Sequence, residues 1–137
     1  MGFRNFFKFT KDVAEDDSDK VITVPDGENW ELLGIYVKLT TTATVGDRQL
    51  EIQVITPTGI LLRLVFEETQ AASLTKRYAA ALGLVSEVHV VGEMIFVRLP
   101  LFHLRSGDTI RVFDSADVDA TADDMEVQIN HISHSNS

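Results

Sequence analysis

The segment Trp30–Thr40 reads WELLGIYVKLT and alternates between two kinds of side chain. Successive residues of a β-strand point to opposite faces of a sheet, so a period of two separates a core face from an outer face. One face carries Leu33, Ile35, Val37 and Leu39, and the other carries Trp30, Tyr36, Lys38 and Thr40. The pattern predicts a long strand whose first face lies in a hydrophobic core.

Similar strand-like runs occur on both sides of this segment, and turn residues such as Pro25-Asp26-Gly27 separate them. The runs are Val21–Val24, Arg48–Thr56, Ile60–Phe66, Val85–Val91, Met94–Leu99, Thr109–Phe113 and Met125–Ile132. About eight short strands at spacings near ten residues are typical of an all-β, antiparallel two-sheet sandwich. The predicted core residues are Leu33, Ile35, Val37, Leu50, Ile52, Val54, Ile110, Val112, Val127 and Ile129.

Residues 67–84 leave two structures open. Leu74, Tyr78 and Leu82 are spaced for one face of a helix, and several alanines lie between them. A strand around Ser73–Ala79 fits equally well, because periodicity does not separate the two in so short a segment.

The composition excludes several classes of protein. The chain has 137 residues, the size of one domain, and its formal net charge of −9 argues against nucleic acid as a partner. It has no cysteine for disulfides or thiolate chemistry, and no apolar run approaches the roughly 20 residues of a membrane helix. The start does not resemble a signal peptide, because Arg4 and Lys8 interrupt its aromatic residues.

The first 20 residues differ from the rest. Half of the eight phenylalanines lie here, and the basic residues of positions 1–11 precede an acidic stretch at 12–19. We predict an extended arm over 1–20, a sandwich domain over 21–132 and a polar tail over 133–137. The arm is expected to be loose in the isolated domain, or folded back on it, and to become ordered on a partner that covers its rings. The predicted partner-binding residues are Phe3, Arg4, Phe6, Phe7, Lys8 and Phe9.

No catalytic or metal-binding motif is evident, and we expect neither an enzyme nor a cofactor. The four histidines (His89, His103, His131 and His134) form no His-x-His pair and are interpreted as surface residues. The acidic stretch Asp114–Asp124 lacks the glycine and terminal glutamate of a calcium loop, so we predict a solvated turn. Arg48 and Arg111 are expected to form exposed pairs with acids, worth about 0–1 kcal/mol each.

Several segments together resemble the small jelly-roll proteins that decorate, or cement, the capsids of tailed bacteriophages. They are Trp30–Val37, Thr41–Leu50, Leu99–Phe102, Gly107–Val112 and Asp123–Val127, within about 21–132. The resemblance implies a jelly-roll sandwich, often trimeric, that is made in the host cytoplasm. It would sit on the outer capsid surface of the virion, bind the major capsid protein and stabilise the shell.

Two other functions stay open. One is a head–tail or tail accessory protein of the same particle. The other is a carbohydrate-binding jelly roll for host attachment, in which Trp30 and Tyr36 would stack on sugar rings; packing of Trp30 at a sandwich edge is the simpler interpretation of that residue.

Ile55 and Phe113, on the outer faces of their strands, are further apolar positions for contact between subunits.

Overall fold

A computed structural model describes residues 4–14, 16–82, 88–90 and 94–135, with side chains described for 7–14, 16–82 and 94–134. The described chain consists of strands and connecting loops. The strands are β1 (Arg4–Asp12), β2 (Asp19–Thr23), β3 (Glu28–Thr40), β4 (Leu50–Thr56), β5 (Gly59–Val65), β6 (Thr75–Ala81), β7 (Val88–Val90), β8 (Met94–Arg98), β9 (Phe102–Leu104), β10 (Thr109–Asp114) and β11 (Asp124–Ser135).

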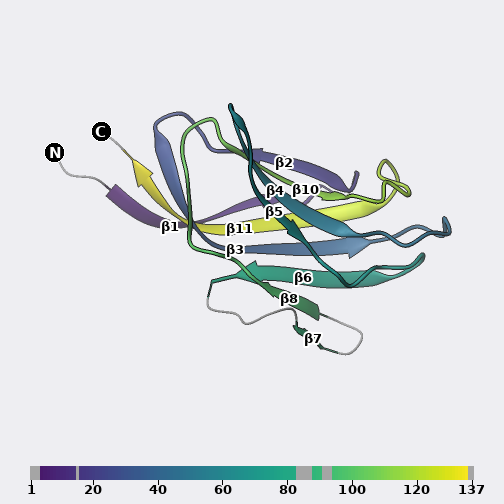
Figure 1. Cartoon of the computed structure of the whole chain (residues 1–137). Helices are drawn as coiled ribbons and strands as arrows, with labels where there is room; N and C mark the ends of the chain where they lie inside the picture. Colours follow the sequence, from purple (N-terminus) through teal and green to yellow (C-terminus); the bar gives the residue numbers. More distant parts are fainter. Residues whose placement is uncertain (1–3, 15, 83–87, 91–93, 136–137) are drawn as a thin grey trace.

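These strands form two sheets that lie as two layers (Figure 1). The larger sheet has the order β1-β11-β3-β6-β8-β7, with β9 also paired to β3, and the smaller has the order β2-β10-β4-β5. The predicted all-β, two-sheet architecture is therefore confirmed. One pair departs from the expected antiparallel pattern: β6 and β8 run parallel, because the chain crosses back through β7 between them.

The core lies between the two sheets and contains nine of the ten predicted residues. The exception is Leu33, which is only partly buried, whereas Leu32 is fully buried. The register of β3 against β11 shifts here, so that Leu33 is an extra residue opposite the step from Asn130 to His131. Such a bulge reverses the facing of every residue on one side of it, and Trp30 consequently points into the core as well.

Of the two structures left open for residues 67–84, the strand is confirmed. β6 pairs with β3 from Thr75 to Ala81, and Tyr78 on this strand is buried. The predicted strand Val85–Val91 lies largely outside the described residues, and its described part is β7.

The described segments nearest the two ends of the chain, β1 and β11, are part of the large sheet. Where the sequence indicated an arm, Arg4–Asp12 pairs antiparallel with β11 of the same chain in nine residue pairs and forms the edge strand. The expected polar tail also differs, because residues 133–135 belong to β11 and Ser133 is buried. The sequence pattern did not show this pairing, because it joins residues more than a hundred positions apart.

One end of the sandwich is closed by an ion pair that the sequence suggested would be exposed. Arg48 and Asp123 are both fully buried, and the carboxylate accepts hydrogen bonds from Nε (2.8 Å) and Nη2 (3.1 Å) of the guanidinium. Hydrogen bonding to Asp123 raises the pKa of Arg48 further. The expectation of an exposed, energetically minor Arg48 was wrong. Arg111 does pair as expected, with partly exposed Asp19 on the neighbouring strand.

The acidic stretch Asp114–Asp124 is more than a solvated turn. Asp114 accepts hydrogen bonds from the backbone of Gln49, Ala116 and Val118, and Asp119 accepts them from the hydroxyls of Thr42 and Thr44. These contacts fasten the loop before β11 to the loop before β4. Of its five aspartates only Asp117 is largely exposed, whereas the other four are buried or half-buried.

Candidate partner-binding surface

The most exposed aromatic residues of the described chain lie side by side on β1. Phe7 and Phe9 are two positions apart and therefore point to the same face of the strand. Their ring centroids are 5.0 Å apart with an interplanar angle of 84°, an edge-to-face contact. Both rings remain more than half exposed, at 59% and 55%. They form an apolar projection on the outer face of the large sheet.

Two side chains on the opposite face of β1 attach it to the domain. Thr10 Oγ1 lies 2.9 Å from His131 Nε2, and Lys8 Nζ lies 3.7 Å from Glu28 Oε1. Glu28 also accepts hydrogen bonds from Ser133 Oγ and Trp30 Nε1. The bond from Ser133, more than the nearby charge of Lys8, keeps the pKa of Glu28 below its usual value.

His131 is a core residue, so the interpretation of all four histidines as surface residues was wrong for this one. Its ring stacks on Trp30 with centroids 3.8 Å apart, and its Nδ1 is buried with no hydrogen-bond partner among the described residues. Burial lowers the pKa of His131 to about 4, in spite of the opposing attraction of Glu28. A neutral imidazole therefore supports the inner side of β1 at neutral pH.

The six predicted partner-binding residues are not one cluster. Phe7 and Phe9 share the outer face, whereas Lys8 points inward toward Glu28. Arg4 and Phe6 lie on β1 opposite Ser135 and Ser133, with side chains outside the description, and Phe3 lies outside the described residues. The sequence thus indicated the aromatic pair, but it did not show that Lys8 points to the opposite face of the strand from Phe7 and Phe9.

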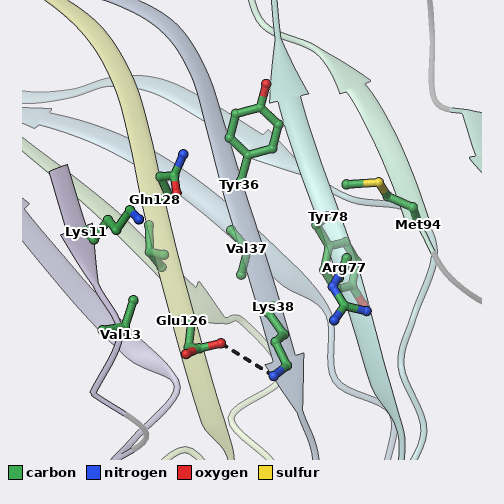
Figure 2. Close-up of a pocket in the computed structure, with 11 residues that line it drawn as sticks. Lys11, Val13, Tyr36, Val37, Lys38, Arg77, Tyr78, Met94, Glu126 and Gln128 are labelled. Atoms are coloured by element: carbon green, nitrogen blue, oxygen red, sulfur yellow. Dashed lines mark ion pairs between the residues drawn. The ribbon is translucent and has the colours of Figure 1, made fainter. Parts of the chain in front are cut away.

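A groove of about 340 Å³ continues this surface across the large sheet (Figure 2). Its outward-facing side chains come from β11, β3, β6 and β8, with β1 and the residue that follows it at one side. They are Lys11, Val13, Tyr36, Lys38, Arg77, Met94, Glu126 and Gln128. The alternation of β3 had already placed Tyr36 and Lys38 on an outer face. Arg77 and Met94 were missed, because only the pairing of β6 with β3 and β8 brings them here.

The groove is positively charged on a protein that is strongly negative. It has three cations and one carboxylate, a formal charge of +2, whereas the whole chain carries −9. Glu126 lies 3.5 Å from Lys38, which leaves the charges of Lys11 and Arg77 in excess. Tyr36 covers Gly34, where a Cβ would lie 3.1 Å from the Tyr36 ring, so the aromatic ring fills the space of the missing side chain.

The acidic stretch after β1 is folded around one buried cation. Lys20 Nζ lies within 4 Å of Asp12, Asp16 and Asp17 and donates to the carbonyl of Ala14 at 2.7 Å. Burial alone would lower the pKa of Lys20, but hydrogen bonds to Asp16 and Asp17 outweigh it and raise that pKa. This cluster fixes the direction in which the chain passes from β1 in one sheet to β2 in the other.

Within the described residues, no group of three or more histidine or acidic side chains is placed to hold a metal ion. His103 and His134 lie near Glu31, at 4.0 Å and 3.6 Å, and the side chain of His89 is outside the description. No helix of the described chain is long and apolar enough to cross a membrane.

The fold and this surface define the class of the molecule as a two-sheet β-sandwich with an aromatic and basic outer face. No known protein family matches the chain, and no curated protein matches it in sequence.

Proposed function

We propose that the protein is a structural component of a virion, a capsid decoration or cement protein that binds the major capsid protein. Its sandwich would be of the jelly-roll type, its usual state a trimer, and its position the outer capsid surface. The two-sheet fold, the interleaving of strands from both halves of the chain and the resemblance of residues 21–132 to such proteins support this proposal.

The exposed pair of Phe7 and Phe9 is the observation that carries it. A fully buried Phe side chain contributes about 1.5–3 kcal/mol, and these rings leave more than half of that contribution unrealised in the isolated chain. Aromatic residues are enriched among the few that dominate binding between proteins. A shell that covers both rings would therefore hold the domain in place, and binding only the assembled shell would stabilise that shell by mass action.

The alternative of a head–tail or tail accessory protein would use the same surface at another place on the particle. A carbohydrate-binding role is less well supported, because one of its two aromatic residues, Trp30, is 2% exposed and packs on His131. Tyr36 remains accessible in the groove, but it lies over Gly34 and offers no paired ring.

The test is co-sedimentation of the purified protein with shells assembled from the major capsid protein of the same virus. We expect the wild type to bind the shells. The double variant Phe7→Ser/Phe9→Ser should bind at least tenfold more weakly, which corresponds to a loss of about 1.4 kcal/mol or more of binding free energy. Electron cryomicroscopy of the complex would then distinguish the outer shell from a tail position.

The matched control is Leu61→Ser, which removes an apolar side chain that is 60% exposed on the other sheet. It should bind like the wild type. Absence of binding by the wild type, or equal binding by the wild type and the double variant, would contradict the proposal. Binding to a glycan array in place of shells would favour the carbohydrate alternative.

A further inference from the structure

The loop between β3 and β4 presents an apolar side chain to solvent in a fixed position. Val45 is 90% exposed, the most exposed large apolar residue of the described chain. The buried guanidinium of Arg48 donates hydrogen bonds to the backbone carbonyls of the two residues that flank Val45, Thr44 at 2.8 Å and Gly46 at 2.7 Å. The loop is therefore ordered before any partner arrives, which lowers the entropic cost of binding.

The same loop also contacts the segment 117–119 before β11, which we call the bracing segment. Thr44 donates its hydroxyl to Asp119, and Gly46 lies so close to Val118 that an added Cβ would be 2.9 Å from it. Burying a charge pair such as Arg48 and Asp123 carries a large desolvation cost. Here the guanidinium of that pair also fixes the backbone on both sides of the exposed Val45.

We propose that this loop docks into the basic groove of a second copy of the chain. The loop carries exposed Val45 and, two positions later, exposed Asp47; the bracing segment adds exposed Asp117, the residue before Val118 that lies against Gly46. The groove carries the excess charges of Lys11 and Arg77 around the apolar surfaces of Val13, Tyr36 and Met94. The two surfaces are complementary in charge, and each combines charged with apolar side chains.

The two surfaces are different patches of one molecule, so the contact is head-to-tail. A contact of this kind closes into a ring when the rotation between copies permits, and otherwise continues as a filament. A ring of three would give the trimer suggested above. The inference rests on the proposed function only for that copy number, because it concerns copies of the chain and needs no shell.

Charge reversal tests the contact in the purified protein by analytical ultracentrifugation at micromolar concentration. The wild type should sediment as an oligomer of the 15.2-kDa chain. Asp47→Lys/Asp117→Lys and Lys11→Glu/Arg77→Glu should each weaken the association by about tenfold or more. The first pair moves the net charge toward zero, so general repulsion between copies would predict tighter association. Combining all four substitutions in one chain restores the wild-type net charge of −9 and should restore the oligomer.

Val45→Ser should weaken the oligomer as well, whereas Leu61→Ser should leave it unchanged. Far-ultraviolet circular dichroism checks that each variant is folded. A monomeric wild type, an oligomer that is insensitive to both reversals, or a combined variant that stays monomeric would overturn the inference. Shell binding through Phe7 and Phe9 is measured separately, so failure of either proposal is distinguishable from failure of the other.

Discussion

Replacing Asp123 with Asn should destabilise the domain strongly although it scarcely changes the shape of the side chain. The carboxylate accepts two hydrogen bonds from Arg48 and one from the backbone amide of Thr42, at 2.8–3.1 Å, and both charged side chains have no exposed surface. The substitution leaves the buried guanidinium without its directly paired carboxylate, and the more distant charges of Asp114 and Asp119 do not replace that contact. Breaking a buried pair by removing one partner costs about 3–5 kcal/mol.

Urea unfolding measures this effect conveniently, because the chain has a single tryptophan and it is buried against His131. The midpoint should fall with little change in the dependence on denaturant. A double variant, Arg48→Met/Asp123→Leu, should lose less stability than the sum of its two single variants, since it leaves no unpaired charge.

Lys38→Gln is the control, because it removes a partly exposed pair with Glu126 and should cost no more than about 1 kcal/mol. If Asp123→Asn costs as little as this control, the guanidinium has found other compensation and the role assigned to the pair is wrong. A double variant as destabilised as the sum would mean that the two residues act independently.

Two further predictions concern the buried His131 and the loop residue Gly46. His131 has a pKa of about 4 when folded and a usual value near 6.5 when unfolded, so the unfolded chain binds more protons between these values. Stability should be complete above about pH 6.5 and fall toward pH 4, by as much as about 3 kcal/mol, and His131→Gln should remove this part of the slope in urea titrations at a series of pH values. At Gly46, φ is 143° and a Cβ would meet Val118, so Gly46→Ala should cost about 1–3 kcal/mol in thermal unfolding. Adding Val118→Ala should recover only the steric part of that cost, and full recovery would show that backbone strain contributes nothing.

The fold class was predictable because the evidence for it is local. Alternation along Arg48–Thr56 or Met125–Ile132 determines which side chains face a core, whatever the strands pair with. The sequence did not show which residues of β3 on the N-terminal side of its bulge face the core. Leu32 and Leu33 are both leucines, and either one satisfies the alternating pattern. The pairing of Arg48 with Asp123 spans 75 positions, and each residue lies beside turn-forming neighbours that suggest a solvated loop. The basic groove was not predictable for the same reason, since it requires the lateral order of five strands, β1-β11-β3-β6-β8.

The N-terminal segment, predicted as an arm that is loose or folded back on the domain, is an edge strand in the structure. Ordering each residue costs about 1–2 kcal/mol, and burial of the phenylalanines at about 1.5–3 kcal/mol per side chain is only comparable to that cost over residues 1–11. The structure holds β1 by other means, through main-chain pairing with β11 and the contacts of Thr10 and Lys8 on its inner face. The rings of Phe7 and Phe9 therefore stay more than half exposed in the folded domain. A partner that covers them meets rings already fixed on an ordered strand, and it would gain their burial without the cost of ordering the chain.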